Sequence, residues 1–250
     1  MSNLAKLKKE ILADGIIDGS EVKRIEKVLY EDGKIDRNEA NFIFSLNDAV
    51  SGKKNSPNWN KLFVKALTDH FLKDKKSFGK LDEKESEYLI KKIKSDNIVD
   101  KAEQDLILNI LSKAKSTPKK FQTFVFSTFK KIILEDGKID PDEVKVIKKI
   151  IYGVGGSSGK DVDRTEANWL FDLNDAVSGK KNHFSWKKLM VDAISSHLLN
   201  DKKSPGVIDD SEAKWLVKRI QKDGKLDSVE KEILVALKKK AKKISKFLKV

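Results

Sequence analysis

The sequence predicts an all-α protein made of two similar halves, and three observations support this prediction. Apolar residues recur at steps of three and four, for example Ile25, Val28 and Leu29, which is the spacing of one helix face. No stretch alternates apolar and polar residues over the length of a strand, and only 4 prolines interrupt the 250 residues. The chain also carries the ten-residue sequence LNDAVSGKKN twice, at Leu46–Asn55 and at Leu173–Asn182.

The duplication extends beyond this decapeptide. Trp59 and His70 in the first half correspond to Trp186 and His197, each 127 positions further along the chain. A chain of this length suits two domains of ordinary size, and we expect them at residues 1–114 and 115–250. The expected boundary is the lysine-rich segment 113–120, which contains a Ser-Thr-Pro break. We therefore expect two tandem helical bundles that are copies of one unit.

Six helices are expected in each half, because apolar residues recur at helical steps in six segments of each. In the first half these segments are 3–13, 19–30, 37–51, 57–73, 82–94 and 100–114. In the second half they are 118–134, 141–152, 164–178, 184–200, 209–221 and 227–247.

The last expected helix is long because Leu237, Ala241, Ile244 and Leu248 would share one face, with lysines elsewhere. Such a helix most often closes a bundle and exposes its basic side to water. The alternative is a peripheral contact with an anionic membrane or an acidic partner.

Eight turns with related sequences separate the expected helices. Four of them read Asp-Gly-x-Ile/Leu-Asp-x-x-Glu, at Asp14–Glu21, Asp32–Glu39, Asp136–Glu143 and Asp223–Glu230. Four others keep part of this pattern, at Gly79–Glu85, Asp96–Glu103, Lys160–Glu166 and Gly206–Glu212. The glycine suits the left-handed conformation that ends a helix. The second aspartate suits an N-cap, and the glutamate three residues later completes a capping box. This interpretation needs no metal.

The same turns resemble the rear half of a calcium-binding loop, which has Gly at position 6, an aliphatic residue at 8 and Glu at 12. The third turn of each half supplies the most carboxylates, although a lysine stands at position 3 of each loop. The candidate ligands of Ca²⁺ or another divalent cation are Asp74, Asp82, Glu85, Asp201, Asp209 and Glu212.

The four complete turns resemble those of the tellurite-resistance TerB-like domain group, which has the N-terminal domain of the co-chaperone DjlA as a relative. EF-hand proteins are a more distant resemblance. The resemblance implies small α-helical bundles in which acidic residues have been linked to divalent-metal binding and to stress responses. It rests on Asp14–Glu21, Asp32–Glu39, Asp136–Glu143 and Asp223–Glu230.

One histidine in each half, His70 or His197, lies on the same helix face as a tryptophan. We expect a structural histidine with one hydrogen-bond partner, which would be Asp48 or Asn47 in the first half. The equivalent partners in the second half are Asp175 and Asn174. The alternative is a histidine–carboxylate metal or catalytic site, but no cysteine, second paired histidine or nucleophile accompanies it.

The decapeptide ends in Gly-Lys-Lys-Asn in both halves. Its lysines, Lys53, Lys54, Lys180 and Lys181, are candidate contacts for an anion or a partner, because such a turn can present backbone N–H groups and two charges. The alternative is that Gly52 and Gly179 simply end the preceding helix.

The net charge of +13 invites a nucleic-acid interpretation, but all except four of the 52 basic residues are lysines. Arginine is the preferred residue for paired contacts with phosphate and guanine, so we expect a lysine-rich surface without a specific nucleic-acid partner. The chain has no cysteine, which excludes disulfides and thiolate metal sites. Its N-terminus lacks a signal-peptide pattern, and no long apolar run occurs. These features favour a soluble cytoplasmic protein.

No nucleophile–base pair or cofactor loop is evident, so we expect binding and not catalysis. The first hypothesis is a divalent-cation-responsive stress or accessory protein of TerB-like type. The alternative is a metal-independent scaffold that presents two equivalent surfaces to an unidentified protein partner.

Overall fold

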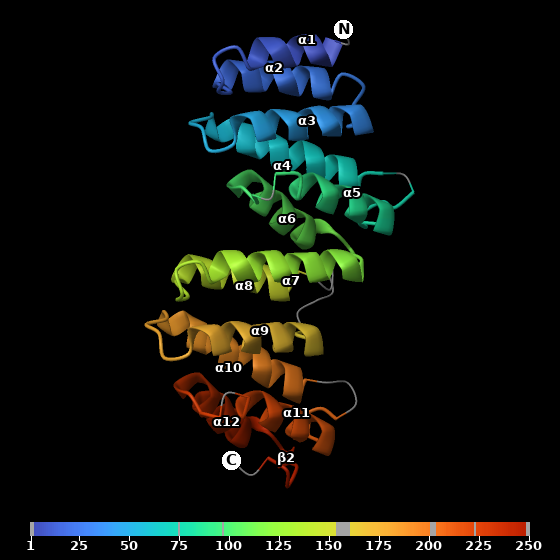
Figure 1. Ribbon diagram of the computed structural model, residues 1–250. Coiled ribbons are helices and arrows are strands. Elements are labelled where there is room, and N and C mark those ends of the chain that lie inside the picture. Colours follow the sequence, from blue (N-terminus) through green and yellow to red (C-terminus); the bar gives the residue numbers. More distant parts are fainter. Residues whose placement is uncertain are drawn as a thin grey trace. The chain divides into compact units, whose positions relative to one another are not determined.

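The computed structural model describes residues 3–74, 76–96, 98–153, 161–200, 204–222 and 224–248. The described chain is mostly helical, which confirms the all-α prediction (Figure 1). No helix in this part of the chain is both long and apolar enough to cross a lipid bilayer.

The first six helices are α1 (Asn3–Ile11), α2 (Gly19–Leu29), α3 (Arg37–Val50), α4 (Pro57–Leu72), α5 (Glu83–Ile93) and α6 (Lys101–Lys113). They are followed by α7 (Lys119–Ile133), α8 (Pro141–Ile151), α9 (Arg164–Val177), α10 (Phe184–Leu199), α11 (Asp210–Ile220) and α12 (Ser228–Lys240). Every helix except the last ends within two residues of its expected bounds.

The chain divides into two compact units. Unit 1 holds the chain up to Val125 together with Gly153, and unit 2 holds Phe126–Tyr152 and the described residues from 161 onward. This division lies within α7, whereas the sequence places the boundary after residue 114. The segment after α6 belongs to unit 1 because its backbone is bonded there: Lys115 N donates to Gly79 O at 2.6 Å, and Leu81 N donates to Ser116 O at 3.1 Å.

The C-terminal segment differs from the prediction. Helix α12 ends at Lys240, and Ala241 is extended. A two-residue strand β2 (Lys243–Ile244) follows and pairs in parallel with β1 (Val207–Ile208). The continuous amphipathic helix expected up to residue 247 is therefore wrong for this segment, and peripheral membrane contact by this segment stays an untested alternative. Pairing with β1 satisfies backbone groups in a way that side-chain periodicity does not reveal.

Each unit has its own aromatic core. In unit 1 the rings of Phe44 and Phe63 meet edge to face with centroids 5.7 Å apart, and Phe71 is also fully buried. In unit 2 Phe171 and Trp186 are fully buried. In unit 1 these residues come from α3 and α4, and in unit 2 they come from α9 and α10. Their burial packs together the two helices that the repeated decapeptide joins.

The eight turns with related sequences all end in a capping box at the start of the next helix. At the start of α3, for example, Asp36 Oδ1 accepts from Glu39 N at 2.8 Å, and Glu39 Oε2 accepts from Asp36 N at 2.8 Å. The N-cap aspartates are Asp18, Asp36, Asp82, Asp100, Asp140, Asp163, Asp209 and Asp227. The capping interpretation of the sequence is confirmed, and each cap stabilises its helix by about 1 kcal/mol.

Candidate functional site

The repeated decapeptide joins neighbouring turns in unit 1. Ile17, in the α1–α2 turn, accepts a hydrogen bond from Ser56 N at 2.8 Å, and its own N–H donates to Asn55 Oδ1 at 2.9 Å. These bonds hold the α1–α2 turn against the α3–α4 turn. Both turns lie on the left of unit 1 in Figure 1.

A buried amide connects the same joint to the start of α6. Asn47 Nδ2 donates to Asp100 Oδ2 at 2.8 Å, and Ser51 Oγ donates to the same oxygen at 2.8 Å. Trp59 Nε1 donates to Asn47 Oδ1 at 3.3 Å. Because a buried amide must be hydrogen-bonded, this arrangement fixes the α5–α6 turn beside the other two.

Unit 2 repeats the joint with equivalent residues. Asn174 Nδ2 and Ser178 Oγ donate to Asp227 Oδ2 at 2.8 and 3.1 Å, and Trp186 Nε1 donates to Asn174 Oδ1 at 3.3 Å. His183 N donates to Ile139 O at 2.8 Å. We call the surface formed by these three turns in each unit its three-turn face. In unit 1 the turns are α1–α2, α3–α4 and α5–α6, and in unit 2 they are α7–α8, α9–α10 and α11–α12.

The four decapeptide lysines lie on the three-turn faces. Lys53 and Lys54 in unit 1, and Lys180 and Lys181 in unit 2, are exposed. None of them forms an ion pair with another described residue. Gly52 and Gly179 adopt φ of 73° and 74°, so their glycine identity follows from helix termination. The Lys53 ammonium lies against Gly15 of the α1–α2 turn, and contact of the four lysines with a partner stays a prediction.

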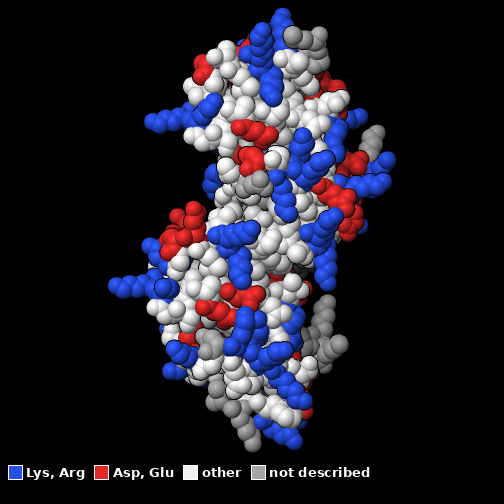
Figure 2. Space-filling view, in the orientation of Figure 1, with Lys and Arg blue, Asp and Glu red and all other residues white. Residues whose placement is uncertain are grey.

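Lysine and arginine are common on the rest of the surface as well. Figure 2 shows basic side chains spread over the face in view, with acidic side chains between them. The mixture of signs agrees with a solvated lysine-rich surface.

Large apolar side chains are also exposed on the three-turn faces, and sequence analysis missed them. Ile98 is 63% exposed and Ile16 is 36% exposed. Both occupy the variable position after the glycine or asparagine of the turn pattern, where Lys34 and Lys138 stand in other turns. In unit 2 Phe184, the first residue of α10, is 76% exposed. A position-by-position comparison of the turn sequences could have identified these exposed apolar residues.

Four of the six residues predicted to bind metal act as helix caps, namely Asp82, Glu85, Asp209 and Glu212. Glu85 Oε2 accepts from Asp82 N at 2.8 Å, and Ser77 Oγ also donates to Glu85, at 3.2 Å. Burial raises the pKa of the Glu85 carboxyl above its ordinary value. In unit 2 Glu212 Oε2 accepts from Asp209 N at 2.9 Å. Asp201 lies outside the described residues.

Among the described residues, no three His, Asp or Glu side chains are grouped so that they could hold a metal ion. The capping glutamates direct an oxygen at a backbone N–H of their own turn. Asp74 and Glu85 do line a common pocket, however, so the structure brings together two of the six predicted ligands. Cation binding by this set stays a prediction.

The pocket in unit 1 has a volume of about 720 Å³ and lies between the α2–α3 turn and the end of α4. It carries charges of both signs. Its lining residues are Tyr30, Asp32, Gly33, Lys34, Ile35, Asp36, Arg37, Asp69, His70, Lys73, Asp74, Lys76 and Glu85.

Several groups in the pocket are already paired. Tyr30 Oη donates to Asp69 Oδ2 at 2.9 Å, and Lys73 forms an ion pair with Asp69 at 3.0 Å. Burial, followed by the hydrogen bond to this carboxylate, raises the pKa of Tyr30 well above its ordinary value. The phenol therefore acts as a hydrogen-bond donor and stays neutral at physiological pH.

The histidine partner expected from the sequence is wrong. His70 Nδ1 lies 2.8 Å from the Ile35 carbonyl oxygen, and His197 Nδ1 lies 2.8 Å from that of Val162. Neither Asp48 nor Asn47 bonds to His70. Burial lowers the pKa of His70, so its neutral form donates from Nδ1 and pins the α2–α3 turn to α4. The structural role is thus retained, with a backbone acceptor 35 residues away.

An arginine stacks on an aromatic ring beside the histidine in both units. The Arg37 guanidinium lies 3.1 Å from the centre of the Tyr88 ring, and Arg164 lies 4.2 Å from the centre of the Trp215 ring. Tyr88 Oη is fixed by donating to Asn41 Oδ1 at 3.0 Å. Arg37 forms no hydrogen bond or ion pair with any described residue, so its donors remain available at the pocket edge.

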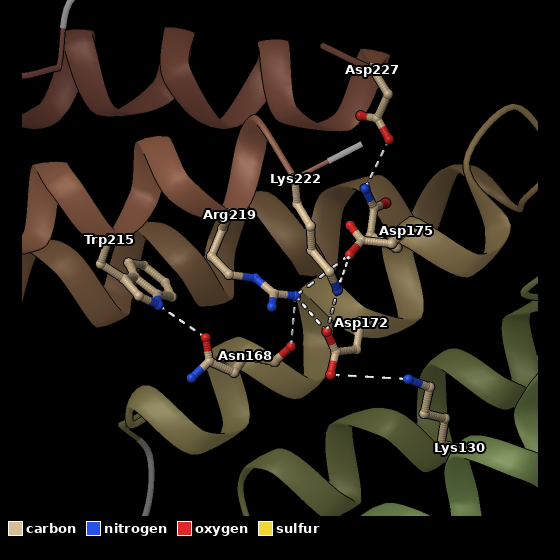
Figure 3. A network of polar contacts seen from close by, with 9 residues as sticks. Lys130, Asn168, Asp172, Asp175, Trp215, Arg219, Lys222 and Asp227 are labelled. Carbon is tan, nitrogen blue, oxygen red and sulfur yellow. Dashed lines mark hydrogen bonds and ion pairs between the residues drawn. The ribbon is translucent and has the colours of Figure 1, made fainter. Parts of the chain in front are cut away.

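Unit 2 contains an ion-pair network that sequence analysis also missed. Arg219 donates to Asp172 at 2.7 Å, and Lys222 donates to Asp172 at 3.2 Å and to Asp175 at 2.9 Å. Figure 3 shows Arg219 and Lys222 converging on the two aspartates, with Lys130 approaching Asp172 from α7. Burial opposes ionisation of Asp172, but the hydrogen bonds from Arg219 and Lys222 hold its pKa below its ordinary value.

The described residues of unit 1 form no equivalent network. Position 172 corresponds to Ser45, and Arg219 corresponds to Lys92. Asp48, the counterpart of Asp175, forms no ion pair with a described residue. Burial and the nearby Asp96 raise the pKa of its carboxyl. The two units therefore share a backbone joint but differ in the charges around it.

Four capping glutamates are buried, namely Glu103, Glu166, Glu212 and Glu230, and the pKa shift is large for the first two. Glu103 is 3% exposed, and burial, with the nearby Asp100 charge, raises its pKa to about 8. Burial likewise raises the pKa of Glu166 to about 8. These two carboxyl groups complete capping boxes in their units while carrying a proton for much of the neutral pH range.

Comparisons with protein-family models, with curated proteins and with solved structures give no match for this chain.

Proposed function

We propose that this protein is a non-enzymatic, metal-independent scaffold that presents its two three-turn faces to partners, with a protein partner on the face of unit 1. The proposal is supported by the different roles of the side chains within the repeated decapeptide. Its asparagines and serine hold three turns together, and its two lysines are left on the surface. A duplicated joint of this kind provides two similar platforms whose outward residues can differ.

The observation that carries the proposal is the outward display of Ile98 and Ile16 on the three-turn face of unit 1. The turns do not require apolar residues at positions 16 and 98, since Lys34 and Lys138 occupy the equivalent position elsewhere. Aromatic and aliphatic side chains placed on an otherwise charged surface are the usual anchors of protein–protein interfaces.

The experiment is photo-crosslinking in living cells with the full chain. A photoreactive amino acid replaces Ile98, and in a matched control it replaces Val235, which is 47% exposed on α12. We expect a discrete crosslinked partner from position 98 and none from position 235. Adding Ile16→Lys should remove the crosslink from position 98. Equal crosslinking from both positions would overturn the proposal.

A second candidate function is the cation response of the third turns, in a stress or accessory role of TerB-like type. It is favoured by the presence of Asp74 and Glu85 in one pocket with Asp32 and Asp69. Calorimetric titration with Ca²⁺, Mg²⁺, Mn²⁺ and Zn²⁺ tests it, and the scaffold proposal expects no heat and no thermal stabilisation. A heat signal that Asp74→Asn removes would establish the cation site, because Asp74 caps no helix.

A further inference from the structure

The start of α10 carries four lysines around an exposed aromatic ring. Phe184 is 76% exposed. Lys180 and Lys181 precede it in the α9–α10 turn, and Lys187 and Lys188 follow it by three and four positions, on the same side of the helix. None of the four lysines forms an ion pair with a described residue. We call these five residues the basic–aromatic patch.

The patch departs from what the local structure favours. In unit 1 the equivalent helix begins with Ser56 as N-cap and Pro57 at the first helical position, a combination that both capping and proline geometry favour. In unit 2 the same two positions are His183 and Phe184. Histidine is not among the favoured N-caps, and the Phe184 ring contacts the His183 ring, with centroids 4.3 Å apart, yet stays 76% exposed.

The charges also oppose the helix dipole. The N-terminus of a helix carries a partial positive charge and favours acidic residues. The eight helices with capping boxes each have a glutamate in their first turn, whereas α10 has no acidic residue there. Four lysines and the dipole thus concentrate positive charge around Phe184, and an external negative charge would relieve the repulsion.

We propose that the basic–aromatic patch binds the surface of an anionic lipid bilayer, with Phe184 inserted among the headgroups. Lysine ammonium groups are flexible point charges that attract diffuse negative charge without a fixed geometry, unlike the planar fork of arginine. A negatively charged bilayer attracts such clusters electrostatically, and an aromatic ring adds apolar contact at the interface. The decapeptide lysines of unit 1 lack this ring, since Pro57 stands in its place.

The test is co-sedimentation of the full chain with vesicles of phosphatidylcholine alone or of phosphatidylcholine mixed with phosphatidylserine. We expect binding only to the mixed vesicles, and weaker binding as salt increases. The double variant Lys180→Gln/Lys181→Gln should bind about twentyfold more weakly, because each lysine near an anionic surface contributes severalfold to the affinity. Phe184→Ser should also reduce binding, and Phe184→Trp should retain it.

Matched controls come from unit 1. Lys53→Gln/Lys54→Gln changes the same two lysines of the identical decapeptide, and Phe78→Ser removes another exposed phenylalanine. Both should bind as the unaltered chain does. Urea unfolding of every variant separates loss of binding from loss of folding, and the lysine variant tests the proposal even if Phe184→Ser is unstable.

Three results would overturn the proposal. The first is no sedimentation with the mixed vesicles, and the second is an equal loss of binding in the unit 1 controls. The third is binding of a polyglutamate peptide to the patch in the absence of any vesicle binding, which would identify an acidic polypeptide as the partner. Crosslinking from position 98 in unit 1 is independent of all three, so the scaffold proposal is tested separately.

Discussion

Asn47 donates to the carboxylate of Asp100 at 2.8 Å, and this bond joins the end of α3 to the start of α6 across 53 positions of the chain. Asp100 uses its other oxygen, Oδ1, to cap α6 by accepting from Glu103 N at 3.0 Å. One aspartate therefore serves as a helix cap and as the anchor of the repeated decapeptide. Asp227 and Asn174 have the same relationship in unit 2, at the same distance.

Replacing the buried amide should destabilise its unit strongly. Asn47→Ala leaves Trp59 Nε1 without its acceptor and Asp100 without one donor, so we expect the free energy of unfolding to fall by about 2–4 kcal/mol. Asn174→Ala should have a similar effect in unit 2. Urea unfolding followed by tryptophan fluorescence measures both. A loss well under 1 kcal/mol in either variant would contradict the structural role assigned to the decapeptide.

The ion-pair network should stabilise unit 2 only. Arg219 is 15% exposed at its side chain and pairs with Asp172, so Arg219→Ala should lower the free energy of unfolding by about 2 kcal/mol, because two acidic groups lose their best partner. The equivalent change in unit 1, Lys92→Ala, should alter stability by less than about 0.5 kcal/mol, as is usual for surface sites. Thermal unfolding of the two variants, compared at equal ionic strength, checks this contrast.

The buried Glu103 should make stability depend on pH. Its folded-state pKa of about 8 lies above the ordinary value of 4.5, so the folded state binds more protons than the unfolded state between these values. Stability from this group is present at low pH and is lost as the pH rises toward 8. Glu103→Gln keeps an acceptor for Asp100 N but has no charge, and it should flatten this fall.

Urea midpoints measured across this pH range, for the unaltered chain and for Glu103→Gln, provide the test. Glu21→Gln is a suitable control because Glu21 completes a capping box of the same kind, in which Glu21 Oε2 accepts from Asp18 N in an exposed setting. A slope that Glu103→Gln leaves unchanged would show that another group is responsible.

The C-terminal segment should contribute to the stability of unit 2. Lys242 N donates to Gly206 O at 2.7 Å, Ser245 N donates to Ile208 O at 2.9 Å, and Leu248 is buried. A chain ending at Lys240 loses these contacts, so its free energy of unfolding should be lower by about 2–3 kcal/mol. This loss is comparable to the contribution of one buried leucine with its supporting hydrogen bonds. Calorimetric unfolding tests this, and an unchanged transition would mean that the β1–β2 pairing adds nothing.

The sequence determined the helices and their turns, because the signals involved are local. A glycine, an aspartate and a glutamate at fixed spacing specify a left-handed residue and a reciprocal cap, whatever surrounds them. At Asp36 and Glu39, for example, both capping bonds are found as the pattern predicts. These turns resemble calcium-binding loops for the same reason, because one local pattern of carboxylates occurs in both kinds of turn.

Only the tertiary structure decided which distant groups meet. His70 bonds to the carbonyl of Ile35, and residues 241–248 leave the helix to pair with the 206–208 segment. A backbone carbonyl has no sequence signature, so periodicity could not identify it as a partner. The exposure of Phe184 likewise follows from the packing of the whole unit. The sequence shows that the first residue of this helix is apolar, but the neighbouring turns decide whether its side chain is buried or exposed.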